Sequence, residues 1–110
     1  MNGKDTLTII QGDQIPIGVR LEDEDGESIT PSAVSEVTIS LGNAVHKMTD
    51  EENPVTYDAE EELWMFRITQ EETLALTMGV HALAAEVAFA DATIDNATVA
   101  AVYVLPGRER

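Results

Sequence analysis

Apolar and polar residues alternate along much of the chain, and a period of two is typical of β-strands that bury one face. The alternating apolar positions are Ile15, Ile17, Val19 and Leu21, then Val37, Ile39 and Leu41, and then Trp64, Phe66 and Ile68. A β-branched, apolar stretch over residues 6–11 predicts a strand before them, and residues 98–105 predict the last strand. The three large side chains of the Trp64 run are expected to anchor the core, because burying each is worth about 1.5–3 kcal/mol.

Turn residues separate these runs and predict short connections. The Asp-Gly pair at residues 25–26 lies in an acidic hairpin loop over residues 22–27, because Asp-Gly adopts the positive φ angles that tight turns need. A second acidic loop, residues 58–62, joins two further expected strands into a hairpin. Pro16 has no backbone N–H to donate, so the start of its strand is expected at a sheet edge or a bulge.

The stretch after Ile68 carries the helical signal of the chain. Thr69 and Glu72 have the spacing of a capping box, which predicts a short helical turn. Residues 80–90 fit both a helical stripe and one face of a strand. The alanines in this segment favour a helix, whereas Gly79 and the surrounding strands favour a strand. We predict a strand, followed by a turn over residues 91–96.

This succession of strands and short turns predicts an all-β fold. About seven strands with one short helical turn indicate a two-layer antiparallel β-sandwich of the immunoglobulin-like kind. The Cys-Trp-Cys core of antibody domains is absent, so the pattern indicates the architecture only. No repeat or linker divides the sequence, and we expect a single β-sandwich domain over residues 1–110.

The charge of the chain restricts its partners. Six Lys and Arg residues stand against 21 Asp and Glu, which gives a formal net charge of −15. We expect binding neither to nucleic acid nor to an anionic membrane surface, because both depend on Lys and Arg. The acidity instead favours solubility and basic or cationic partners.

Cysteine usage and the N-terminus add two expectations. The chain has no cysteine, which excludes disulfides, thiol catalysis and thiolate metal sites. The sequence begins without the apolar run of a signal peptide and contains no stretch of 18 uninterrupted apolar residues. We therefore expect synthesis and folding in a cytoplasm, without a membrane span.

Candidate catalytic and metal-binding groups fail on spacing or partner. Asp23, Asp25 and Gly26 resemble part of a calcium loop, but the first and last positions of an EF-hand lack the acids that bind the ion. The carboxylates of residues 58–62 share one wet loop rather than facing each other across a cleft. His46 and His81 have no metal-binding spacing. We expect no enzymatic activity, metal or cofactor.

The final strand is apolar on both faces, which is unusual for a half-exposed strand. Ala97, Val99, Ala101, Tyr103 and Leu105 share one face, and Ala100, Val102 and Val104 share the other. One interpretation is a central strand that is covered on both sides. The other is an exposed apolar strip that binds another subunit, with Val102, Tyr103 and Val104 as contact residues.

The N-terminal motifs resemble those of a known protein class. Residues 7–13 (LTIIQGD), 15–21 (IPIGVRL) and 24–31 (EDGESITP) are similar to the opening of small phage structural proteins and of the N-terminal domains of phage baseplate upper proteins. Residues 56–58, 63–64 and 69–73 are similar to the middle of such proteins. The resemblance implies an immunoglobulin-like sandwich and a non-enzymatic virion component made in the bacterial host cytoplasm.

Two hypotheses for function follow. The first is a phage or prophage virion structural or assembly module that contacts other virion proteins or copies of itself, which would make it part of an oligomer. The second is a host-surface or carbohydrate-binding β-sandwich module. The few aromatic residues, which the pattern directs mostly inward, favour the first hypothesis.

Overall fold

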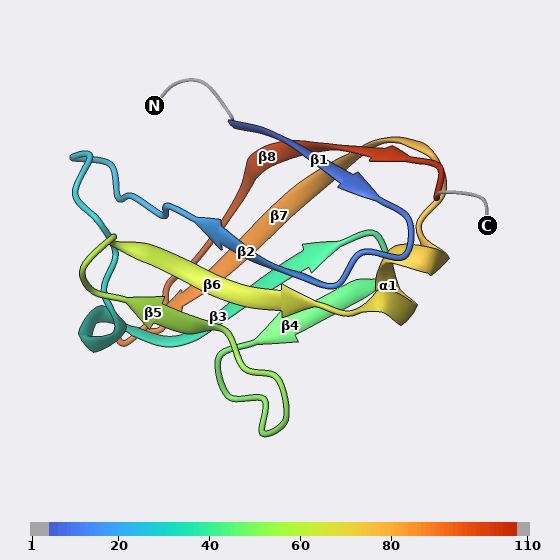
Figure 1. The fold of residues 1–110 in the computed structure, drawn as a ribbon. Helices are drawn as coiled ribbons and strands as arrows, with labels where there is room; N and C mark the ends of the chain where they lie inside the picture. Colours follow the sequence, from blue (N-terminus) through green and yellow to red (C-terminus); the bar gives the residue numbers. More distant parts are fainter. Residues whose placement is uncertain (1–4, 108–110) are drawn as a thin grey trace.

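Two β-sheets pack face to face in the computed structural model, which describes residues 5–107 (Figure 1). The larger sheet has the order β1 (Asp5–Ile10), β8 (Ile94–Leu105), β7 (Gly79–Phe89), β3 (Val34–Leu41) and β4 (Ala44–Lys47). The smaller sheet has the order β2 (Ile15–Val19), β6 (Leu63–Ile68) and β5 (Thr56–Asp58). A 3-10 turn η1 (Pro31–Ala33) and a helix α1 (Gln70–Ala75) complete the described elements. The predicted all-β, immunoglobulin-like sandwich is confirmed.

The core lies between the two sheets and uses the alternating positions of the sequence. Trp64, Phe66 and Ile68 are buried on the inner face of β6, as predicted. The inner faces of β3 and β7 cover them from the other sheet, and the buried side chains of those strands are Val34, Val37, Ile39, Leu41, Leu83, Ala85 and Val87. The indole N–H of Trp64 donates to the Ile29 carbonyl oxygen at 2.9 Å, so this polar group is paired inside the core.

Strand pairing explains the placement of two unusual residues. β2 is an edge strand, so Pro16 sits at an edge as predicted. β1 pairs in parallel with the C-terminal half of β8, whereas the other pairings between named strands are antiparallel. The loop over residues 22–27 does form a tight tip, where Glu22 bridges Ser28 and Gly26 has φ +82°. The chain then crosses to the other sheet, because β2 and β3 belong to different layers.

Residues 80–90 form a strand almost throughout, which confirms the predicted choice of strand over helix. β7 pairs with β3 on one side and β8 on the other, so tertiary pairing outweighs the helix propensity of its alanines. Two boundaries differ from the prediction. β8 begins at Ile94 rather than at residue 98, and Ala44–Lys47 forms a strand where none was predicted.

The β7–β8 hairpin contains a bulge that changes which side chains face the core. Leu83 pairs with Ala100, but Ala84 pairs with Thr98, so Val99 has no partner of its own. The extra residue reverses the faces along the N-terminal half of β8. Ala97 therefore shares a face with the buried side chains of β8, and its predicted place beside Tyr103 was wrong.

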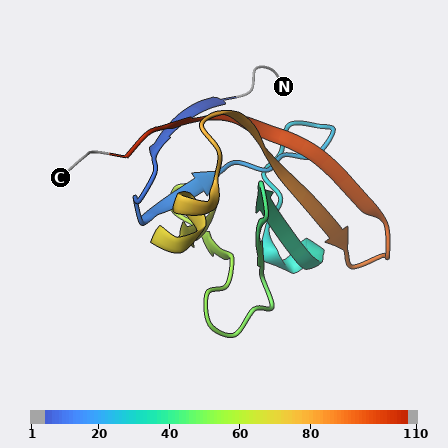
Figure 2. The ribbon, with the colours of Figure 1, turned by 90° about the vertical axis from the view of Figure 1, so that its right-hand side faces the viewer.

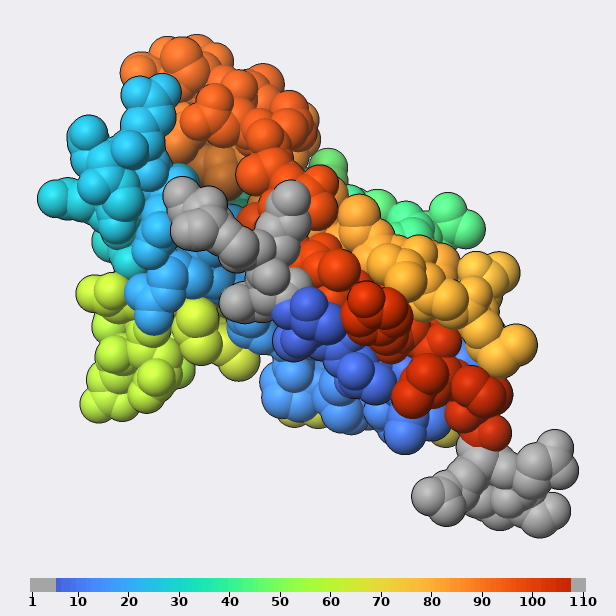
Figure 3. Space-filling model, turned by 90° about the horizontal axis from the view of Figure 1, so that it is seen from above, coloured from blue at the N-terminus to red at the C-terminus, as the bar shows by residue number. Residues whose placement is uncertain are grey.

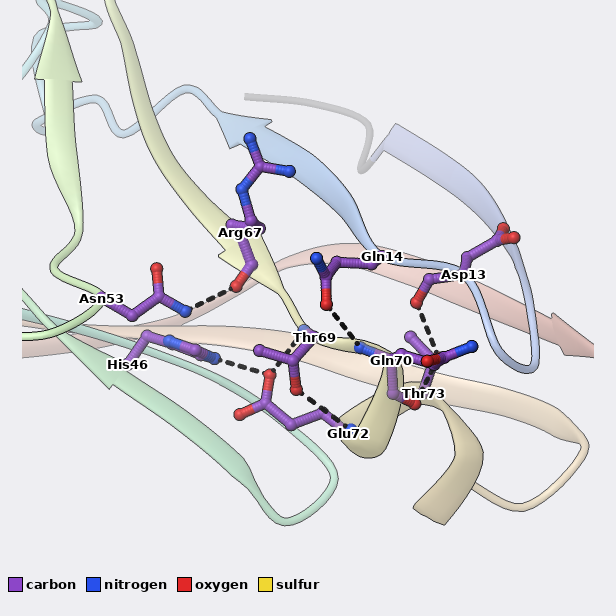
Figure 4. A network of polar contacts seen from close by, with 9 residues as sticks. All are labelled: Asp13, Gln14, His46, Asn53, Arg67, Thr69, Gln70, Glu72 and Thr73. Atoms are coloured by element: carbon purple, nitrogen blue, oxygen red, sulfur yellow. Dashed lines mark hydrogen bonds and ion pairs between the residues drawn. The ribbon is translucent and has the colours of Figure 1, made fainter.

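The end of the sandwich near α1 is held by a network of polar contacts (Figure 4). The predicted capping box is present: the Thr69 hydroxyl accepts from the Glu72 N–H, and the Glu72 carboxylate accepts from the Thr69 N–H. The same Glu72 carboxylate oxygen lies 2.9 Å from Nε2 of buried His46 on β4. The Thr73 hydroxyl donates to the Asp13 carbonyl oxygen at 2.8 Å. These contacts join the helix to β4 and to the loop between β1 and β2.

Candidate interaction surface

The three predicted contact residues on β8 point to opposite faces of the larger sheet. Val102 and Val104 are 0% and 1% exposed and belong to the core. Neither is accessible to a partner on the folded chain, so their assignment as contact residues is corrected. The reason is that β8 lies between β1 and β7, and its inner face packs against the smaller sheet. Tyr103 is 45% exposed on the outer face, and its role in binding stays a prediction.

Tyr103 lies in a row of uncharged side chains across three strands. It is directly opposite Thr8 of β1 and Val80 of β7. Val80 is exposed, and so are Leu105 of β8 and Ile10 of β1, which form the neighbouring pair on the same face. An exposed tyrosine beside aliphatic side chains is typical of protein interfaces, where aromatic residues are enriched.

The middle of this outer face carries mostly small side chains. Its outward positions on the described strands are Thr6, Ala101, Ala82, Thr98, Ala84, Ser40 and Val45. Beside Ala84, Ser40 and Val45 the face is hollowed by a shallow depression of about 490 Å³. Small side chains allow another backbone or ring to approach the sheet closely.

Charge is scarce on this face although the whole chain carries −15. The described charged side chains on it are Glu36, Glu86 and Lys47, at the end of the face away from Tyr103. The acids instead gather in the exposed loops over residues 22–27 and 58–62. The desolvation free energy of burying this face in an interface is therefore small, because few charged groups lose their hydration.

The acidic loops use carboxylates to hold their own turns. Asp23 Oδ1 accepts from the N–H groups of Asp25 and Glu27 at 2.9 and 3.0 Å. Asp58 Oδ1 accepts from the Glu60 N–H at 3.1 Å in the same manner. Within residues 5–107, no group of three His, Asp or Glu side chains is placed to hold a metal ion. In the described part of the chain, no helix has the length and apolar character to cross a membrane.

His46 is a buried polar side chain to which the sequence pattern assigns no role. It is 3% exposed, and its ring stacks at 5.0 Å from that of Phe66. Nε2 bonds to Glu72, while Nδ1 has no hydrogen-bond partner among the described residues. The contact joins residues far apart in the sequence, so no local motif signalled it. It positions β4 against helix α1.

The β7–β8 turn contains a carboxyl with a perturbed pKa. The hydroxyl and N–H of Thr93 both donate to Asp91 Oδ1, at 2.6 and 3.0 Å, and these bonds hold the pKa of Asp91 below its usual range. Asp91 is exposed and no second ionisable group joins it in these contacts. The shift therefore reflects turn formation.

Comparisons with known proteins support the fold. No protein-family model matches the chain, and no curated protein matches it in sequence. Among solved structures, it is similar to the fibronectin(III)-like modules of Clostridium thermocellum CbhA, with a TM-score of 0.54 and 16% identity over 98% of this chain and 93% of that chain. At this identity the likeness shows the fold alone: the chain has a fibronectin III-like, immunoglobulin-like β-sandwich.

Proposed function

We propose that the chain is a non-enzymatic interaction module that binds another protein through the outer face of its larger sheet. The observation that carries this proposal is that the described side chains around Tyr103 and in the middle of that face are uncharged, in a chain of net charge −15. Interface centres are depleted of charged residues in the same way. The described carboxylates, by contrast, form turns and helix caps rather than a convergent catalytic site.

We further propose that the module is a structural or assembly component of a phage or prophage virion. This step rests on the resemblance of residues 7–31 to the opening of small phage structural proteins. The immunoglobulin-like sandwich agrees with what that resemblance implies. On this proposal the chain is made in the bacterial cytoplasm and ends in the particle, in contact with other virion proteins.

The net charge favours a different protein over a second copy as the main partner. Two chains of −15 repel each other at low ionic strength, and burying uncharged faces must overcome that repulsion. A neutral or basic virion protein meets no such barrier. Self-association is therefore expected only where a second protein holds the copies together.

The experiment is to purify particles from the bacterium that encodes the chain. After prophage induction, DNA-filled particles are banded by density, and the chain is quantified against the major capsid protein by mass spectrometry. We expect a fixed copy number that survives a second gradient. The proposal is overturned if the chain stays in the soluble fraction while complete particles form without it.

A host-surface or carbohydrate-binding module is the alternative, and the exposed ring of Tyr103 is the observation that favours it. A tyrosine ring that is exposed on a sheet face is able to stack on a sugar ring. Retardation of the native chain in polysaccharide gels, abolished by Tyr103→Ala, would establish this function. Equal mobility of both chains in every polysaccharide tested excludes stacking through this residue.

A further inference from the structure

The outer edge of β8 is covered along only part of its length. β1 pairs with residues 100–105 of β8. Over residues 94–99, no strand within residues 5–107 pairs with the same edge. This part of the hairpin extends beyond β1 (Figure 2), and residues 94–98 are exposed. Free N–H and C=O groups along a sheet edge are a template for an added strand.

The uncovered edge borders a groove of about 600 Å³. The β7–β8 hairpin forms one side, and β2 with the loop after it forms the other. Figure 3 shows that loop and the hairpin tip at the same end of the molecule. The apolar lining comes from both layers and includes Val19, Leu21, Ile29, Ala85 and Val87. The groove therefore opens from the sheet edge towards the core.

The bulge at Val99 directs two exposed side chains to this groove. Ala97 is opposite Ala85, and Asp95 is opposite Val87, so each lies on the same face as a buried residue of β7. Without the bulge, the alternation along β8 would turn both side chains to the outer face. The lining of the groove includes Asp95 and Ala97 for this reason.

The rim of the groove is acidic. Asp95 lies on the hairpin side, and Glu22, Asp23 and Glu24 lie on the loop side. The basic residue in the lining is Arg20, whose guanidinium is 3.2 Å from the Glu62 carboxylate. The rim is therefore complementary to lysine and arginine side chains, and its charge disfavours a second copy of this acidic chain.

We propose that this groove binds an extended, basic segment of a partner protein, which adds a strand to the open edge of β8. Apolar side chains of the segment enter the groove at alternate positions, and its lysines or arginines reach the acidic rim. The groove opens on the inner side of residues 94–99, whereas the depression of the outer face lies on their other side. Its occupancy does not depend on the proposed virion role.

The test is a titration of the full chain, labelled with nitrogen-15, with a short capped peptide of alternating lysine and valine. We expect amide chemical shifts to change over residues 94–99 and 20–26. Asp95→Asn is expected to weaken binding about two- to fivefold, as for one exposed charge contact. Glu51→Gln removes the same charge from the exposed loop between β4 and β5, which does not line the groove; it is the matched control and is expected to leave the affinity unchanged.

A second peptide separates strand addition from charge attraction. It is made in two forms, each with the alternate amides of one edge methylated, which removes the hydrogen-bond donors of that edge and keeps the charge; we expect the form that is blocked at the pairing edge to lose binding. The outer-face variant Ala82→Glu is expected to bind the parent peptide normally, so failure of the virion proposal and failure of this one are distinguishable.

Several results overturn the inference. If both methylated forms bind equally well, charge attracts the peptide to the groove and no strand pairs with the edge of β8. If Glu51→Gln weakens binding as much as Asp95→Asn does, the peptide responds to the net charge of the chain and not to this groove. Binding that appears only after residues 2–4 are deleted means that the chain's own N-terminal segment occupies the groove. Dimers that the peptide dissociates, measured by sedimentation, assign the groove to a second copy.

Discussion

Alanine substitutions at two adjacent residues of β8 lower the free energy of unfolding by very different amounts if one residue faces the core and the other the surface, as the structure shows. Val102 is 0% exposed on the inner face, and Tyr103 is 45% exposed on the outer face. Val102→Ala removes two methyl groups from the core. At about 0.8 kcal/mol for each buried carbon, the lost transfer free energy is about 1.6 kcal/mol. The cavity that remains raises the destabilisation to about 2–3 kcal/mol.

Tyr103→Ala is the matched control, because it also replaces a strand-favouring residue by alanine. Its ring keeps about half of its exposure in the folded chain, so we expect a loss below about 1 kcal/mol. The difference between the two variants therefore reports burial rather than strand propensity.

Equilibrium urea unfolding, followed by tryptophan fluorescence, measures both variants, since Trp64 is buried in the core. The midpoint of thermal unfolding is expected to fall by about 8–20 °C for Val102→Ala. A loss below about 1 kcal/mol for Val102→Ala, or equal losses for the two variants, refutes the assignment of faces. Glutamate at Val102 or Val104 is expected to prevent folding, because it buries an unpaired carboxylate.

Three further changes test the interior and the turns. Thr69→Ala is expected to cost about 1 kcal/mol in urea unfolding, and Thr69→Ser much less, because the hydroxyl caps helix α1. Trp64→Phe leaves the Ile29 carbonyl oxygen without its indole donor and is expected to cost at least about 1–3 kcal/mol; a loss below about 0.5 kcal/mol contradicts that bond's role. Urea unfolding of this variant is followed by circular dichroism, because Trp64 is the single tryptophan of the chain. Because hydrogen bonds from Thr93 lower the pKa of Asp91 in the folded chain, its contribution to stability is present above the ordinary value of 3.8 and is lost as the pH falls through the lowered pKa. Asp91→Asn is expected to flatten the pH dependence of stability below about pH 4, and an unchanged profile contradicts the shift.

The alternation of apolar and polar residues predicted most of the strands and their buried faces. The inner positions of β3 and β6 were readable because a period of two separates buried from exposed side chains over several residues. The same rule misassigned Ala97, since a single bulged residue at Val99 reverses the alternation without leaving a sequence signature. β4 was not predicted because its apolar and polar residues lie opposite to the usual pattern: Val45 points outward and His46 points inward.

The candidate surface was only partly predictable. The sequence showed that the last strand is apolar on both faces, but the choice between core and interface depends on what covers each face. Packing against the smaller sheet buries Val102 and Val104 and leaves Tyr103 outside. The charge-poor outer face draws on β1, on the β3–β4 pair and on the β7–β8 hairpin, which are distant from one another in the sequence, so only the order of the sheet brings it together. The pairing of His46 with Glu72 depends on tertiary structure in the same way.

Incorporation of two surface variants into particles tests the central claim most directly. Ala82→Glu places one charge in the middle of the outer face of the larger sheet, and Thr56→Glu places the same charge on the outer face of the smaller sheet. Both positions are exposed, so both chains are expected to fold. Each variant replaces the native chain in the inducing bacterium, and its copy number in purified particles is measured. We expect Thr56→Glu to incorporate normally and Ala82→Glu to be reduced at least tenfold; normal incorporation of folded Ala82→Glu would contradict the assignment of this face.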